Sequence, residues 1–251
     1  MLVAAAVCPC PPLLVPEVAG GAAHEMDDAR AACFDAIGVL TAARVDRLVV
    51  VGPADQPGRG PHPQGAGGSF RGFGTDLQVT LGPGPAKGPA GPGTGGSPAP
   101  GGGVRELPPS LAVGAWLLAR TGWNFAPVEG LGVGELLARE RCAATGREVA
   151  QSAPRVALLV MGDGSACRTL KAPGYFDERA AAFDAAAGTA LGAADLAGLL
   201  ALDEELAYEL KAAGRASWQV LAGAAEGAGL SGRLLYDAAP YGVGYMVASW
   251  A

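Results

Sequence analysis

The stretch "LVAAAVCPCP", residues 2–11, decides the fold class of this chain. Six uninterrupted apolar residues are followed by two cysteines that alternate with prolines. A continuous apolar run is typical of a parallel β-strand that has helices on both faces. No basic segment precedes the run and the prolines follow it at once, so we expect a buried first strand rather than a signal peptide.

The segments that follow this strand predict a parallel sheet. Residues 21–43 are rich in alanine, with charged residues spaced between the apolar ones, which favours a helix. The sequence "RLVVVGP" at 47–53 is a second buried strand that ends at a glycine and a proline. Strand, helix and strand at this spacing indicate a βαβ unit and therefore a parallel pair.

Four more β-segments are expected further along the chain. The sequence "RVALLVMGDGSA" at 155–166 is a third buried strand that runs into a Gly-Asp-Gly-Ser turn. Residues 74–81 alternate as a half-exposed strand does. Near the C-terminus, two β-rich pieces flank Pro240-Tyr241-Gly242 and predict a strand pair or a bulged corner.

Helices are expected between these strands. Residues 110–120 form one helix with Ser110 as its N-cap, and residues 134–146 form another that is closed by Gly146. Residues 176–228 are mostly helical. With its apolar segments spread evenly, residues 1–251 are predicted to be one α/β domain with a mostly parallel central sheet flanked by helices.

Two segments are expected to be loops. Residues 54–68 are polar and rich in glycine and proline. In residues 82–103, sixteen of 22 residues are Gly or Pro, so the segment cannot bury enough surface to offset its ordering entropy. We expect a flexible surface loop there, as an insertion within the domain.

Composition restricts the partners and the cellular location. The net charge is −6 and basic residues do not cluster, which excludes nucleic acid and an anionic membrane surface as expected partners. No segment has the roughly 18 apolar residues that a membrane span requires. The chain has an odd number of cysteines, five, which favours reduced thiols and a cytoplasmic location.

The candidate site comes from the strand ends. In an open α/β sheet, ligands bind beyond the carboxyl ends of the strands. If the three buried strands are neighbours, the segments that follow them converge on one pocket. The candidate pocket residues are Cys10, Ala54, Asp55, His62, Asp163, Ser165, Ala166, Cys167 and Tyr241.

At these segments the chain resembles the class III extradiol ring-cleavage dioxygenase family, which includes the Memo-like proteins. The segments at the three strand ends, "YFDERAAAFDAAAGTAL" from residue 175 and "PYGVGYMVA" from residue 240 carry the resemblance. It covers most of the chain outside residues 56–109. It implies the α/β fold of that family, with the Gly/Pro-rich segment as an inserted loop.

The resemblance also implies an iron site, and this chain departs from it. Family members end the first strand in Pro-His-Pro, where this chain has Cys10 at the histidine position. The second strand of the family ends Ser-Pro-His and a later turn reads Gly-Asp-Leu-Ser-His; here Ala54 and Ala166 stand at those histidines. The family's Fe(II) needs imidazole ligands. The resemblance therefore implies a homologue of non-catalytic or altered function, which binds a small molecule or a partner. A second interpretation is a subunit that works in a homo- or hetero-oligomer.

The alternative is a divalent-metal enzyme, dioxygenase-like or hydrolytic, with a relocated site. Thiolates and carboxylates from Cys10, Asp55, Asp163 and Cys167 are ligands that Zn²⁺ accepts. The plainer interpretation is that the thiols only fill space. If a disulfide forms, Cys10–Cys167 is a better pair than Cys8–Cys10, because residues i and i+2 of an extended chain point to opposite faces.

Three candidates have ordinary explanations beside the functional ones. His62 is expected to be a solvated loop residue, with a position over the pocket as the alternative. Asp163 either braces its own turn or serves as a pocket carboxylate. Tyr241 lies either beside the pocket or in the core.

Overall fold

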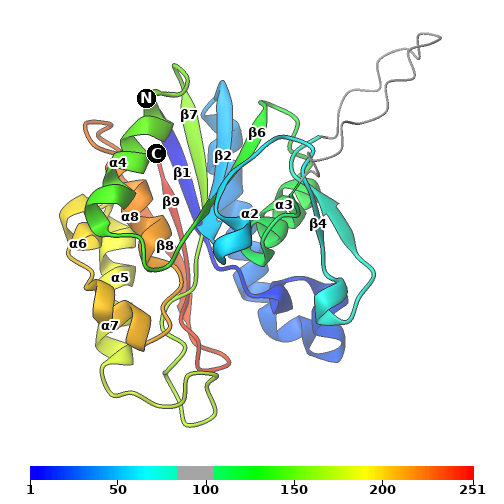
Figure 1. The fold of residues 1–251 in the computed structure, drawn as a ribbon, viewed down its shortest axis with the longest axis vertical. Coiled ribbons are helices and arrows are strands. Elements are labelled where there is room, and N and C mark those ends of the chain that lie inside the picture. Colours follow the sequence, from blue (N-terminus) through cyan, green and yellow to red (C-terminus); the bar gives the residue numbers. More distant parts are fainter. Residues whose placement is uncertain (84–104) are drawn as a thin grey trace.

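The computed structural model describes residues 1–83 and 105–251 and shows an α/β architecture (Figure 1). The loop expected at 82–103 lies outside the described residues, except for Gly82 and Pro83. Within the described residues, the main sheet has the strand order β3-β6-β2-β7-β1-β9-β8. The four strands β6, β2, β7 and β1 are parallel, and the outer strands β3, β9 and β8 are antiparallel to their neighbours.

The strands of the main sheet are β1 (Leu2–Cys8), β2 (Arg47–Pro53), β3 (Gly60–His62), β6 (Val128–Val133), β7 (Val156–Met161), β8 (Gly232–Ala238) and β9 (Tyr245–Trp250). A separate pair consists of β4 (Gly67–Ser69) and β5 (Gln78–Thr80). The α-helices are α1 (Pro16–Ala19), α2 (Asp27–Ala42), α3 (Pro109–Arg120), α4 (Arg139–Gln151), α5 (Ala180–Ala193), α6 (Leu196–Leu200), α7 (Glu204–Glu209) and α8 (Arg215–Ala224). Short 3₁₀ helices are η1 (Pro12–Leu14), η2 (Gly20–Met26), η3 (Gln56–Gly58) and η4 (Arg71–Phe73).

Helices cover both faces of the sheet, as Figure 1 shows: α2 and α3 lie on one face, and α4 to α8 lie on the other. The side chains of β1 alternate between two cores. Ala4, Ala6 and Cys8 face the α2 side, and Ala5 and Val7 face the α8 side. Because both faces are buried, the strand is apolar at every position rather than at alternate ones.

The chain crosses the sheet first in one direction and then in the other. From β1 the chain crosses to β2 and then to β6, moving outward in one direction with α2 and α3 on the same face. From β6 it returns through α4 to β7, which lies between β2 and β1. Right-handed crossovers in opposite directions place their helices on opposite faces of the sheet. The loop that leaves β7 toward α5 therefore diverges from the loops that leave β1 and β2 toward α2 and α3, which is the geometry of a ligand crevice.

The sequence predicted most of these elements correctly. The strands at 2–7 and 47–53 and the strand that begins near 155 are β1, β2 and β7. The helix expected at 21–43 is η2 followed by α2, and the C-terminal strand pair is β8 and β9. The predicted α/β class with a mostly parallel sheet is confirmed.

Two elements differ from the expectation in the segment between β5 and β7. Strand β6 (Val128–Val133) was not expected, because its sequence "VEGLGV" contains two glycines. Helix α4 begins at Arg139 rather than at 134, and Gly146 lies inside it, where it contacts α8 instead of ending the helix.

Two further expectations, for Ser110 and for residues 54–68, were wrong. Ser110 lies within the first turn of α3 and does not cap it. Its hydroxyl donates to the Pro53 carbonyl oxygen at 2.6 Å, so it ties the helix to the end of β2. The loop expected at 54–68 contains β3 and β4, which form because they pair with β6 and β5.

No helix within residues 1–83 and 105–251 is long and apolar enough to cross a membrane.

Candidate functional site at the carboxyl edge of the sheet

The strand ends predicted to converge do lie side by side. Val51 of β2 pairs with Val160 of β7, and Cys8 of β1 pairs with Met161 of β7. Ala54 and Asp163 each lie three residues beyond the Val51–Val160 pair. Cys10 and Asp163 each lie two residues beyond the Cys8–Met161 pair. Asp163 therefore comes at the same level as Ala54 on one side and Cys10 on the other.

Cys10 and Asp163 are joined directly. The main-chain N–H of Cys10 donates to Asp163 Oδ1 at 2.8 Å. Pro9 and Pro11 on either side of Cys10 have no N–H, so β1 cannot continue its ladder and the chain turns into η1. The free N–H of Cys10 is satisfied by the carboxylate of the neighbouring strand end, and the bond joins the ends of β7 and β1.

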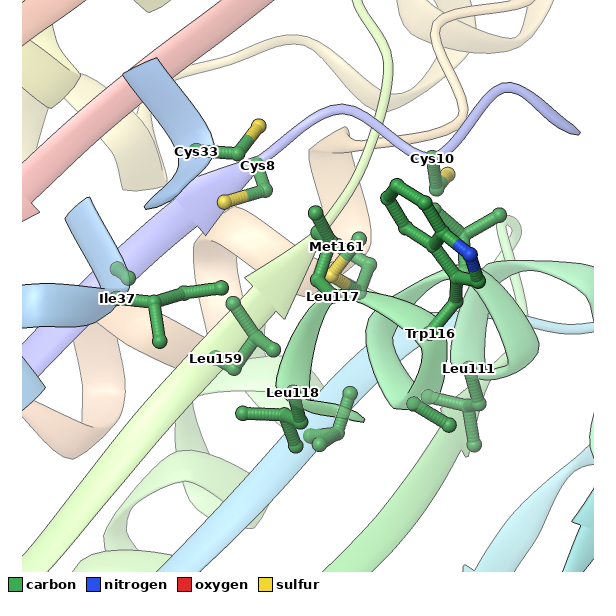
Figure 2. Close-up of a cluster of buried hydrophobic side chains, with 14 of the residues drawn as sticks. Cys8, Cys10, Cys33, Ile37, Leu111, Trp116, Leu117, Leu118, Leu159 and Met161 are labelled. Atoms are coloured by element: carbon green, nitrogen blue, oxygen red, sulfur yellow. The ribbon is translucent and has the colours of Figure 1, made fainter. Parts of the chain in front are cut away.

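The surroundings of this bond are neutral. Figure 2 shows Cys10 beside the indole of Trp116, with Met161, Cys8 and Cys33 nearby in the same buried cluster. Cys10 is 8% exposed and Asp163 is partly buried. In the part of the chain that the structure describes, no Lys, Arg or His nitrogen forms an ion pair with Asp163.

This environment shifts the titration of each acidic group toward the neutral form. Burial raises the pKa of Asp163 to about 7, although the Cys10 N–H opposes the shift. Burial, with the Asp163 charge as the second cause, raises the pKa of the Cys10 thiol well above its ordinary value. The pKa of the Tyr245 hydroxyl on β9 is also raised, mainly by burial. Near neutral pH the site therefore presents a thiol, a phenol and a carboxyl group that is close to half ionised.

A buried clamp holds the turn that follows Asp163. The Asp184 carboxylate on α5 accepts from the Ser165 main-chain N–H at 2.7 Å and from the Ser165 hydroxyl at 2.9 Å. The Arg168 guanidinium donates to the same carboxylate at 2.9 Å. A Cβ on Gly164 would lie 2.7 Å from Asp184 Oδ1, so this approach requires glycine.

Asp184 was not among the site residues predicted from the sequence. The signal was present, because Asp184 is the charged residue in "AAAFDAAAG", an otherwise apolar stretch of helix. A charged residue on the buried face of a helix needs a partner, so it predicts a contact of this kind. Ser165, which was expected to line the pocket, is fully buried and serves this clamp.

Two more predicted residues lie away from the Cys10–Asp163 bond. Asp55 is exposed to solvent after β2. The thiol of Cys167 points to the Gly174 and Leu210 carbonyl oxygens, at 3.5 and 3.4 Å, in the core on the α8 side. Ala54 is buried, while Ala166 is partly buried and its N–H donates to the Leu210 carbonyl oxygen.

The expectation that His62 is a solvated loop residue was wrong. His62 is 1% exposed in β3, which pairs with β6, and its Nε2 lies 2.8 Å from the Gly58 carbonyl oxygen. Strands β6 and β2 separate it from β7, so it does not reach the Cys10–Asp163 bond. Tyr241 is partly buried and packs against the core on the α2 side, and its hydroxyl donates to the exposed Glu25 carboxylate at 3.0 Å.

The Cys10–Cys167 disulfide considered from the sequence does not form. All five cysteines are free and buried. Cys10 belongs to the core on the α2 side, whereas Cys167 belongs to the core on the α8 side. The β-sheet therefore separates the two thiols.

The residues present do not fit the iron that the family resemblance implies. Ala54 and Ala166 offer only methyl groups, which have no lone pairs for a metal. The relocated set of Cys10, Asp55, Asp163 and Cys167 is also not assembled. Across residues 1–83 and 105–251, no three His, Cys, Asp or Glu side chains lie close enough to hold an ion. A Cys10 thiol with a raised pKa is also a poor ligand, because the thiolate is the form that binds metal.

Comparisons with known proteins identify a fold and no family. Neither a family model nor a protein of curated function matches the chain. The structure is similar to the crystal structure of the uncharacterized protein JW3007 from Escherichia coli K12, with a TM-score of 0.51. The match covers 99% of each chain at 11% sequence identity. At that identity, the likeness shows the fold alone.

Proposed function

We propose that this chain is a homologue of the class III extradiol dioxygenases that has lost iron-dependent ring cleavage and acts by binding a ligand or partner at the carboxyl edge of its sheet. One observation carries the proposal: the positions that correspond to the family's histidines hold Cys10, Ala54 and Ala166. Adjusting a pKa cannot restore iron binding at the two alanines, because the donor atoms are missing.

The chemistry that remains is hydrogen bonding. Asp163 accepts one N–H through Oδ1, and its carboxyl group changes charge near pH 7. Cys10 and Tyr245 are neutral at that pH because burial raises the pKa of each. Such a set can recognise a polar molecule but offers no activated nucleophile, since the thiolate is the reactive form of cysteine.

A protein partner is the occupant that a specific observation favours. The segment after the turn carries three large apolar side chains in solvent: Leu170 and Tyr175 are each 65% exposed and Phe176 is 52% exposed. Exposed apolar groups that gather on one segment mark interaction sites. This segment leads from the Asp163 turn to α5, so a partner seated on it would lie next to the carboxyl edge.

Metal content and turnover test the loss of ring cleavage. The purified protein, reconstituted anaerobically with Fe(II), is expected to retain no stoichiometric iron and to consume no O₂ with a catechol. Stoichiometric iron together with catechol cleavage would refute the proposal.

Gel filtration of a cell extract tests the partner. The tagged full chain is expected to elute above its monomer size, and the double variant Tyr175→Ser with Phe176→Ser is expected to elute as the monomer. A monomer in the unsubstituted extract would remove the partner function.

A further inference from the structure

A cavity of about 660 Å³ lies at the amino ends of the parallel strands, away from Cys10 and Asp163. Its volume is within the range of small-molecule sites. The last turn of α4 and the last turn of α8 line it, together with Leu2 at the start of β1. The sequence motifs and the proposed function do not involve these residues.

Two glycines explain why the helix ends meet here. Gly146 of α4 packs on the main chain of α8 at Val220, and Gly223 of α8 packs on the main chain of α4 at Ala143. A Cβ at either glycine would overlap the backbone of the other helix. The two helices are therefore in close contact and end at the same cavity.

Both helix ends present carbonyl oxygens to this region. The last four carbonyls of an α-helix lack intrahelical partners, and the helix dipole places a partial negative charge there. Within the described chain, no main-chain N–H from beyond the helices donates to the carbonyls of Ala150 and Gln151 in α4, or of Gly223 and Ala224 in α8. All four residues line the cavity.

The charged groups of the cavity already have partners. Arg147 and Glu226 form an ion pair of 2.7 Å, with side chains 46% and 43% exposed. The Met1 ammonium donates to the carbonyl oxygens of Ala153 and Pro154 at 3.1 and 2.9 Å. That contact lies at the cavity wall, just beyond the end of α4. An ammonium group of a ligand would donate in the same way to the helix-end carbonyls.

From this combination we propose that the cavity binds a small organic cation, an alkyl- or arylalkylammonium. Its apolar body lies on Leu2, Ala150 and Ala224, and its ammonium group donates to the helix-end carbonyls beside Glu226. The site is independent of the function proposed for the carboxyl edge.

Two phenylalkyl probes of similar size and opposite charge test the proposal, and their binding is measured by calorimetry or NMR titration. Phenethylammonium is expected to bind at least tenfold more tightly than 3-phenylpropanoate. Ala228→Trp, which fills the cavity from its half-buried turn, is expected to weaken binding at least tenfold. Ala181→Trp, on the exposed face of α5, is the control and should change nothing.

Charge variants test the same site without changing its volume. Arg147→Gln frees Glu226 and is expected to tighten phenethylammonium binding about twofold to fivefold, and Glu226→Gln to weaken it by a similar factor. The Arg120–Glu17 pair, 2.6 Å long and similarly exposed, supplies the matched controls Arg120→Gln and Glu17→Gln. No binding, equal binding of the two probes, or an Arg147→Gln effect no larger than that of Arg120→Gln would overturn the proposal.

Discussion

The main-chain N–H of Cys10 donates to the Asp163 carboxylate at 2.8 Å and so joins the ends of two neighbouring strands that lie 153 residues apart in the sequence. This bond lies at the edge of the sheet where α/β folds of this topology bind their ligands. It also places a carboxyl group in a partly buried setting, where no Lys, Arg or His of the described residues forms an ion pair with it. The first prediction follows from that setting.

Asp163 should make the protein less stable as the pH rises from about 4 to about 7. The pKa of the carboxyl is about 7 in the folded state and 3.8 without the fold. Between these values the folded state holds more protons, so its stability falls with rising pH. Asp163→Asn removes this dependence. Between pH 4 and pH 7 the free energy of unfolding of the variant, minus that of the unsubstituted protein, should therefore increase by at most about 4 kcal/mol.

Urea unfolding at a series of pH values measures this difference. Asp55→Asn, at an exposed position, is the control and should follow the unsubstituted protein at every pH. Parallel curves for Asp163→Asn and the unsubstituted protein would contradict the prediction.

Asp184 should contribute far more to stability than an exposed carboxylate at a similar distance from an arginine. Asp184→Ala leaves the Ser165 N–H and hydroxyl without their buried acceptor and removes the partner of Arg168. We expect a loss of about 3 kcal/mol or more, because two buried Ser165 donors lose their acceptor and Arg168, whose side chain is 29% exposed, loses its ion-pair partner. Asp76→Ala, which breaks the exposed 2.6 Å pair with Arg71, should cost about 1 kcal/mol or less. Equal losses in urea unfolding would show that Asp184 is not a clamp.

The thiols should be unreactive in the folded protein. All five are free and buried, and burial raises the pKa of Cys10, Cys33, Cys142 and Cys167. With Ellman's reagent at pH 8, we expect no rapid reaction in the native state and five thiols after unfolding. A total of three after unfolding without reductant would reveal a disulfide.

Replacing Gly146 by alanine should destabilise the chain, although alanine is the better helix former. The added Cβ meets the Val220 carbonyl of α8, so the two helices must move apart, at a cost of about 1–3 kcal/mol. Gly38→Ala is the matched control, because Gly38 lies in α2 with nothing within 4 Å of the added Cβ. That variant should gain about 0.5–1 kcal/mol. A gain in thermal stability for both variants would mean that α4 and α8 are not in close contact.

Local sequence predicted the elements whose pattern is contained in a short window. The unbroken apolar runs of β1, β2 and β7 identify strands buried on both faces, and the alanine-rich segments identify helices. It also supported the inference that Cys10 and Asp163 meet, conditional on their strands being neighbours. The absence of imidazole at the strand ends is likewise a property of the sequence alone.

Tertiary structure decided what depends on distant partners. Strand β6 is a strand because β2 and β3 pair with it, and its two glycines conceal it from any local pattern. His62 is buried through the same pairing, and Gly146 is a packing position because α8 lies against it. The insertion of β7 between β1 and β2 sets Asp163 against Cys10 and leaves Cys167 on the opposite face of the sheet. The apolar periodicity of a segment predicts which of its residues are buried. Which strands pair is determined by contacts between segments far apart in the chain.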